Sequence, residues 1–166
     1  METKREDFRL EEASSGDADA ILALYHSVLD TPYCRWNEHY PCMANIEDDL
    51  SRNALFCIKV DGQIVAAISI DRDDAVEALD CWNKELKPAM ELSRLCVGSA
   101  YQGKGIPALM IEDMMEYGRK KGIRSIHYLV SQYNLAAQRA YARLGFELVG
   151  ECHMYEDDYF CYEKAL

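Results

Sequence analysis

The apolar residues of this chain follow two spacings, one typical of helices and one typical of strands. A helical stripe lies between Ser14 and Pro32. Its apolar positions are Ile21, Leu24, Tyr25, Val28 and Leu29. Short apolar runs at 55–60 and 63–70 flank Asp61-Gly62, a dipeptide typical of a two-residue hairpin turn. The first half of the chain is therefore predicted to place a helix against a β-sheet.

The same spacings assign elements to the rest of the chain. Strands are predicted over 8–12, 55–60, 63–70, 90–97, 125–130, 146–151 and 159–163. Further helices are predicted over 46–53, 105–120 and 134–144. The aromatic-rich residues 31–43 form a connection, and the acidic residues 71–88 are predicted to be an irregular surface insertion. The order β-α-α-β-β-β-α-β-α-β-β predicts a single α/β domain over 1–166, with helices flanking a mixed sheet.

Length and composition narrow the class of protein. The chain has 166 residues, 49% hydrophobic and 28% charged, which is ordinary for a globular domain. The charged start lacks the apolar segment of a signal peptide, and no apolar run could span a bilayer, so a cytoplasmic protein with no membrane partner is expected. The seven cysteines show no C-x-x-C spacing, which favours reduced thiols. Cys34, His39 and Cys42 miss zinc-site spacings, and no metal is expected.

The charges are unevenly distributed. The net charge of −11 argues against a nucleic acid as partner. Residues 117–146 contain no Asp or Glu but six basic side chains, so the rest of the chain carries a net −17. Such a distribution suits an anionic cofactor and a cationic substrate. The alternative is a solvated basic helix end, because residues 119–121 also suit a helix C-terminus.

Residues 95–107 combine an apolar strand, a glycine-rich loop and a helix start, in the sequence LCVGSAYQGKGIP. Backbone N–H groups at a helix start favour a phosphate or pyrophosphate. The phosphate-loop signature G-x-x-x-x-G-K-[ST] is absent. The dinucleotide fingerprint does match Gly103, Gly105 and Ala108, but the acidic residue that should follow the next strand is missing. A dinucleotide-binding fold is therefore rejected.

A second segment, 134–146, completes a longer pattern. Gln102 and Gly105, followed by Asn134 and seven residues later by Tyr141, resemble the signature of the GNAT acyl-CoA N-acyltransferase superfamily. The resemblance covers essentially the whole chain and is strongest over 92–150. It implies a GNAT-like α/β fold, whose mostly antiparallel central sheet is splayed between the fourth and fifth strands. It also implies that acetyl-CoA is the acyl donor.

The resemblance also implies where acetyl-CoA binds. The pantetheine arm would lie beside the strand that ends at Val97, and the pyrophosphate would bind amides of the following turn. The implied cofactor-binding residues are Leu95, Cys96, Val97, Gln102, Gly103, Lys104, Gly105, Ile106, Pro107, Ala108, Asn134, Ala137 and Tyr141. Pro107 departs from the usual Gly or Ala of the family and removes one amide donor. Asn134 also suits the N-cap of its helix.

The implied catalytic groups leave alternatives open. Tyr141 would be the general acid that protonates the CoA thiolate, although it also falls on the apolar stripe of its helix, where a tyrosine can simply pack. Candidate general bases are Glu91, Glu38, His39 and His153, or a water held by one of them. A strand amide near Cys96 or Val97 would stabilise the oxyanion. Cys96 itself could carry an acyl group, but a buried cysteine is the default reading.

The sequence thus predicts an N-acetyltransferase that transfers an acetyl group from acetyl-CoA directly to a primary amine within a ternary complex, with a small cationic amine as acceptor. One alternative is a protein N-terminal or lysine acetyltransferase. Another is a non-catalytic acyl-CoA-binding module. The specificity segments 26–45 and 71–90 carry no motif that names the acceptor, and a homodimer is compatible with the sequence.

Overall fold

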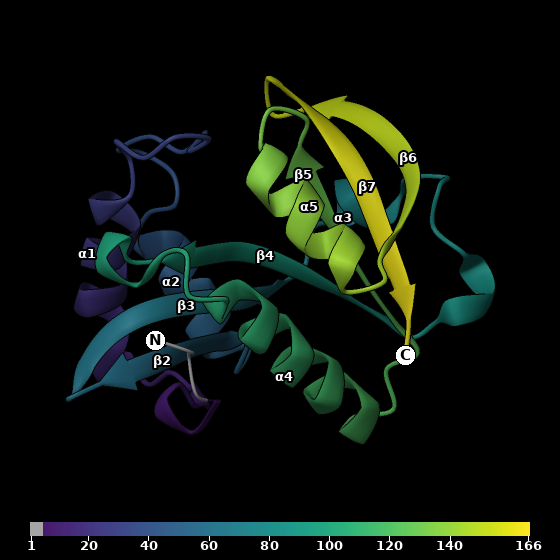
Figure 1. The fold of residues 1–166 in the computed structure, drawn as a ribbon. Coiled ribbons are helices and arrows are strands. Elements are labelled where there is room, and N and C mark those ends of the chain that lie inside the picture. The colour runs from purple at the N-terminus through teal and green to yellow at the C-terminus, as the bar shows by residue number, and fades with distance from the viewer. Residues whose placement is uncertain (1–4) are drawn as a thin grey trace. The chain divides into compact units, whose positions relative to one another are not determined.

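Seven strands form one mixed sheet in the computed structural model, which describes residues 5–166 (Figure 1). They are β1 (Leu10–Glu12), β2 (Leu55–Val60), β3 (Gln63–Asp71), β4 (Ala89–Val97), β5 (Ser125–Ser131), β6 (Glu147–Met154) and β7 (Asp157–Ala165). Their order is β1-β2-β3-β4-β5-β7-β6, with β4 parallel to β5 in a mostly antiparallel sheet. The helices are α1 (Ala18–Ser27), α2 (Met43–Ser51), α3 (Asp74–Glu77), α4 (Ile106–Lys120) and α5 (Leu135–Arg143). The predicted α/β class is confirmed.

The chain divides into two compact units, each built from two segments. The first unit comprises the described residues up to Ile70 together with Arg94–Met110. The second unit comprises Asp71–Ser93 and Ile111–Leu166. No helix of the described chain is both long enough and apolar enough to cross a bilayer.

The first unit packs the predicted α1 stripe into its core. The buried cluster consists of Ala13, Ile21, Leu24, Tyr25, Val28, Ile46, Leu55, Cys57, Ala67 and Cys96. The turn Asp61-Gly62 joins β2 to β3 with positive φ at both residues, as a primed hairpin turn requires. Helix α2 begins three residues earlier than predicted, because the Asn45 side chain accepts a hydrogen bond from the Cys42 amide and closes the first turn.

A buried ion pair also lies in the first unit. Arg94, which has φ +48° within β4, donates from its guanidinium to both carboxylate oxygens of Asp49, with Nη2–O distances of 2.8 and 3.0 Å. The Ser69 hydroxyl and Arg52 donate to the same carboxylate at 2.7 and 2.6 Å. Such a pair holds β4 to α2 because either charge alone would be buried without a partner.

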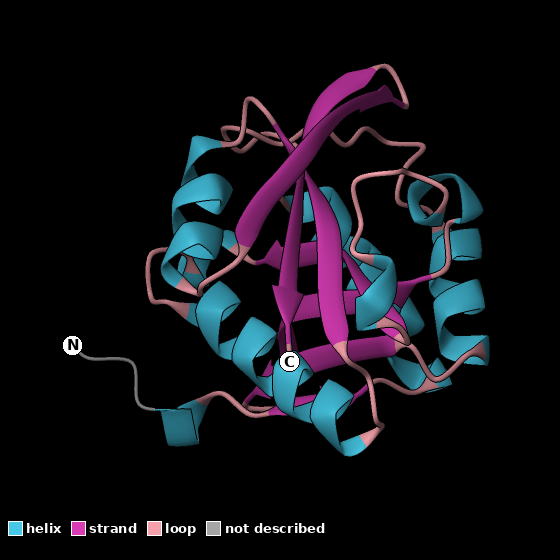
Figure 2. Ribbon diagram, turned by 90° about the vertical axis from the view of Figure 1, so that its right-hand side faces the viewer, coloured by secondary structure: helices cyan, strands magenta, loops and turns pink. Residues whose placement is uncertain are grey.

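The second unit contains the start of β4, then β5, β7 and β6. β4 pairs with β5 only over Ala89–Glu91 and Ser125–His127, whereas β5 pairs with β7 along its whole length. β6 and β7 form a long hairpin (Figures 1 and 2). Its turn, Tyr155-Glu156, has positive φ at both residues, so these strands extend beyond the predicted ends.

The segment 71–88 is more ordered than the sequence predicts. The Asp73 side chain accepts hydrogen bonds from the Ala75 and Val76 amides and starts the short helix α3. Trp82 is buried, and its indole N–H donates to the Val76 carbonyl at 2.7 Å. A four-residue helix is too short for periodicity to reveal, so this cap and this indole contact define an element that the pattern misses.

Candidate active site

The end of β4 in the first unit is closed by local hydrogen bonds. The Gln102 side-chain amide donates to the Val97 carbonyl at 3.1 Å, and the Gly98 amide donates to the Val65 carbonyl at 2.8 Å. The Val97 carbonyl, at the end of the strand predicted to lie beside the pantetheine arm, therefore already accepts a hydrogen bond from within the chain. The Gln102 side chain thus links the end of β4 to the turn that follows it.

The turn that opens α4 has an unusual backbone. Gly103 and Gly105 have φ of +75° and +76°, and no heavy atom lies within 4 Å of the position that a Cβ would occupy at either residue. The first bond of the helix runs from the Leu109 amide to the Gly105 carbonyl at 3.3 Å. Amides before this bond have no acceptor within the helix. Since Pro107 has no N–H, Ile106 and Ala108 are the donors of the first turn.

The basic and thiol side chains near this turn have defined partners. Lys104 is exposed, and its ammonium lies 5.5 Å from the centre of the Tyr101 ring. Cys96 is buried, and its thiol donates to the Leu24 carbonyl at 3.8 Å. Burial raises the pKa of the Cys96 thiol to about 12, so it stays protonated at neutral pH. A buried structural cysteine fits these facts better than an acyl carrier does.

In the second unit, Asn134 caps α5. Its side-chain oxygen accepts a hydrogen bond from the Ala137 amide at 3.1 Å, so this amide of a predicted cofactor-binding residue already has an acceptor. The capping interpretation of Asn134 therefore holds. No acidic residue lies in the first turn of α5.

Tyr141, about two turns after Asn134 on α5, lies in an aromatic cluster. Its ring centre is 4.2 Å from that of Tyr128 and 6.1 Å from that of Tyr162, in edge-to-face geometry. Phe146 packs 4.9 Å from Tyr128 on the same cluster. Burial raises the pKa of Tyr141 to about 12, so the hydroxyl keeps its proton at neutral pH. This is the protonation state that a general acid needs before it acts.

The candidate bases differ sharply in burial. Glu91 on β4 is only 6% exposed. Glu38 and His39 are both highly exposed and contact each other at 3.4 Å. His153 is also exposed and contacts Asp158 at 2.7 Å. Of the four predicted candidates, only Glu91 is removed from bulk water.

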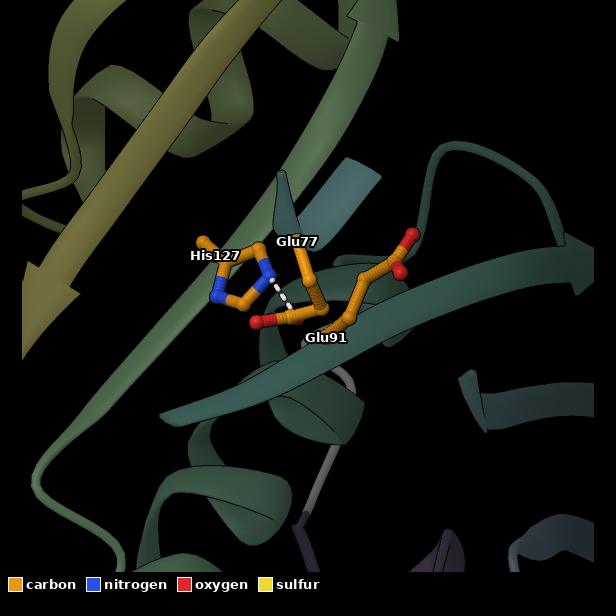
Figure 3. A group of neighbouring side chains, drawn as sticks. All are labelled: Glu77, Glu91 and His127. Carbon is orange, nitrogen blue, oxygen red and sulfur yellow. Dashed lines mark ion pairs between the residues drawn. The ribbon is translucent and has the colours of Figure 1, made fainter. Parts of the chain in front are cut away.

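Beside Glu91 lies a histidine that the sequence reading passed over. His127 on β5 is buried, and its Nε2 atom lies 2.7 Å from Glu77 Oε1. The dashed line in Figure 3 marks this ion pair. The Trp82 ring packs against the imidazole at a centre-to-centre distance of 4.5 Å. Burial lowers the pKa of His127, although the nearby Glu77 carboxylate acts in the opposite direction. The lowered pKa favours a neutral imidazole ring. In the sequence, His127 could have been noticed only as a histidine within the largely apolar run 125–130.

A second polar pair of the same unit lies at the β6–β7 turn. The exposed Tyr155 donates its hydroxyl to the Asp73 carboxylate. This hydrogen bond raises the pKa of Tyr155, partial burial raises it further, and the negative charges of Asp73, Glu91 and Asp71 act in the same direction. The environment of Tyr155 is therefore electrostatically negative and suits a cation.

The predicted cofactor-binding residues belong to both units. Residues 95–108 lie in the first unit, whereas Asn134, Ala137, Tyr141 and the candidate base Glu91 lie in the second. The structure directly joins Gln102 to Val97, and Asn134 to Ala137.

Comparison with known proteins places this arrangement in a family. The model of the Acetyltransferase (GNAT) family matches residues 21–146. An uncharacterised N-acetyltransferase of Methanocaldococcus jannaschii is 36% identical over 73 residues, which are 42% of this chain and only 32% of that protein. A GNAT-family acetyltransferase from Streptococcus pneumoniae shares the fold with a TM-score of 0.74 and 21% identity, over 96% of this chain and 99% of that chain. The yncA acetyltransferase of Salmonella typhimurium, solved with its cofactor acetyl-CoA, has a TM-score of 0.71 and 18% identity, over 95% and 93% of the two chains. Because the family model matches well over half of the sequence, this chain belongs to the GNAT acetyltransferase family.

Proposed function

We propose that this protein transfers an acetyl group from acetyl-CoA to a primary amine within a ternary complex, and that its two units act as one acetyltransferase domain. Family membership supports the reaction class. The turn that opens α4 is the observation that carries the choice of donor. Gly103 and Gly105 have positive φ with open space at each Cβ position, and they precede a fifteen-residue helix whose first-turn amides have no acceptor within the helix. Such a helix start favours the pyrophosphate of a nucleotide cofactor.

The proposed chemistry assigns one task to each group. Glu91, a buried carboxylate, would accept the proton that the attacking amine must lose. The amine then attacks the thioester carbonyl, and a backbone amide near Cys96 would stabilise the oxyanion. Collapse of the tetrahedral intermediate breaks the carbon–sulfur bond, and Tyr141 would donate its proton to the leaving thiolate. The pKa of about 12 supports this role, because the phenol is protonated when it is needed.

The acceptor that fits best is a small cationic amine. The chain carries a net charge of −11, and the negative charges of Asp73, Glu91 and Asp71 act on Tyr155 in the second unit. A negative field of this kind raises the encounter rate with cations and disfavours anionic acceptors.

A panel of acceptors tests this proposal. The full chain is incubated with acetyl-CoA and linear polyamines, a lysine-rich peptide, a peptide with a free N-terminus, or an amino acid of net negative charge, and release of free thiol is followed. Polyamines should be turned over fastest. Preference for either peptide would instead indicate a protein acetyltransferase. Binding of acetyl-CoA without turnover of any amine would indicate an acyl-CoA-binding module.

A further inference from the structure

Three side chains able to bind a metal come together in the second unit from distant parts of the sequence. Glu77 ends α3, Glu91 lies on β4 and His127 lies on β5. One donor atom from each residue lies within 4.8 Å of the donor atoms of the other two. Glu91 and His127 are direct neighbours in the parallel pairing of β4 and β5, which directs both side chains to one face of the sheet. Glu77 meets the imidazole from α3 (Figure 3).

The His127 imidazole of this group is tightly surrounded, but its ring nitrogens lack hydrogen-bond partners. The His127 side chain is 1% exposed, and neither of its ring nitrogens has a hydrogen-bond partner among the described residues. The 2.7 Å contact between Nε2 and Glu77 has the distance of an ion pair without the alignment of a hydrogen bond. Buried polar atoms in native proteins almost always have a partner, so an imidazole in this state is suited to a bound ion. The Trp82 ring packs against the imidazole, with an angle of 38° between the two ring planes.

We propose that Glu77, Glu91 and His127 bind one divalent transition-metal cation, of which Zn²⁺ is the best match. One imidazole nitrogen and two carboxylate oxygens are a donor set that Zn²⁺ accepts, whereas Mg²⁺ and Ca²⁺ prefer oxygen donors alone. Three protein ligands leave a fourth tetrahedral position for water. The cation would also relieve the repulsion between two carboxylates that lie this close together.

The geometry needs only a small adjustment. Donor atoms around a tetrahedral Zn²⁺ are about 3.4 Å apart, so the 2.7 Å contact must open slightly and the longer separations must shorten. Glu77 can make this movement, because its side chain is 39% exposed and it ends a helix of four residues. A bound ion would engage the carboxylate proposed as general base. Zn²⁺ is therefore expected to inhibit acetyl transfer rather than to assist it.

Metal binding is measured on the full chain, without acetyl-CoA, after treatment with a chelator. Titration calorimetry with Zn²⁺ should give one ion per chain, and Co²⁺ should give the visible absorption of a site with nitrogen and oxygen ligands. His127→Gln and Glu77→Gln should each weaken Zn²⁺ binding by about tenfold or more. His153→Gln is the matched control, since that exposed histidine also contacts a carboxylate but lies outside the group. Circular dichroism checks that each variant folds.

Several results would overturn the proposal. They are no uptake of either ion by the unmodified protein, equal affinity in a folded Glu77→Gln variant, or loss of binding in His153→Gln. A sulfur-to-cobalt charge-transfer band would assign any bound ion to cysteines instead. The affinity for acetyl-CoA is measured in the same samples, so failure of the metal site leaves the proposed acetyl transfer to be judged on its own assay.

Discussion

Replacing Tyr141 by Phe removes one hydroxyl and almost nothing else. The ring that packs 4.2 Å from Tyr128 and 6.2 Å from Phe146 is retained, and so is the edge-to-face geometry. The variant therefore separates the two interpretations of this residue. If Tyr141 only packs, the change should cost at most about 1 kcal/mol in the free energy of unfolding, the usual contribution of one hydrogen bond.

If the hydroxyl is the general acid, the effect falls on turnover. General acid catalysis contributes roughly a hundredfold to ten-thousandfold, which corresponds to about 3–5 kcal/mol in the activation free energy. Because the pKa of Tyr141 is about 12, its proton is present throughout the neutral range, and the loss in the variant should not change between about pH 6 and pH 9. The affinity for acetyl-CoA should change little, because the lost interaction forms mainly in the transition state.

The assay measures kcat by thiol release, the affinity for acetyl-CoA and the melting temperature of the same preparation. Tyr162→Phe is the matched control, because that residue belongs to the same aromatic cluster, 6.1 Å from Tyr141, and has no proposed role in catalysis. A Tyr141→Phe enzyme with a kcat within about twofold of the unmodified protein would refute the assignment. An equal loss of kcat in both variants would refute it too, since damage to the cluster would then explain the effect.

The remaining predictions concern the donor, the acceptor and the core. Gly105→Glu should abolish the rise in melting temperature that acetyl-CoA causes. Gly62→Glu is the control, because both glycines have positive φ and open space at the Cβ position: each variant should lose about 1–2 kcal/mol of stability, but Gly62→Glu should keep the rise. Normal binding by Gly105→Glu would show that the pyrophosphate binds elsewhere. The kcat/KM for cationic amines should fall as salt increases, and a value independent of ionic strength would contradict electrostatic attraction. Asp49→Asn should lower the free energy of unfolding by about 3–5 kcal/mol, measured by denaturant unfolding, because Arg94 loses its buried partner. Asp48→Asn, which changes an exposed carboxylate, should cost less than about 1 kcal/mol. Similar small losses in both variants would show that the buried pair does not stabilise the fold.

The fold was largely predictable because most elements are long periodic runs bounded by turn residues. The strand predicted over 90–97 is Ala89–Val97, and the helix predicted over 105–120 is Ile106–Lys120. The errors occur where structure depends on single side chains. The hairpin turn of β6 and β7 uses Tyr155-Glu156, two residues that rarely adopt positive φ and give no turn signal in the sequence.

The parts of the candidate site differ in the same way. The glycine turn before α4 is a local motif, so its residues could be named from the sequence. Glu77, Glu91 and His127 are separated by 14 and 36 positions and share no motif. A parallel pairing of three residues between β4 and β5 brings the last two together, and a short helix without periodicity supplies the first. Register between distant strands cannot be deduced from spacing along one sequence.

The position of Glu91 explains how one carboxylate could serve two roles. On β4 it lies next to His127, and its charge also acts on Tyr155 at the β6–β7 turn. Glu91 is only 6% exposed, so bulk water screens its charge weakly. This weak screening, together with the nearby Glu77 carboxylate, strengthens the attraction of Glu91 for a divalent cation. A protonated amine and a metal ion are therefore attracted to the same negative charge, so acetyl transfer and its inhibition by metal ions should both depend on Glu91.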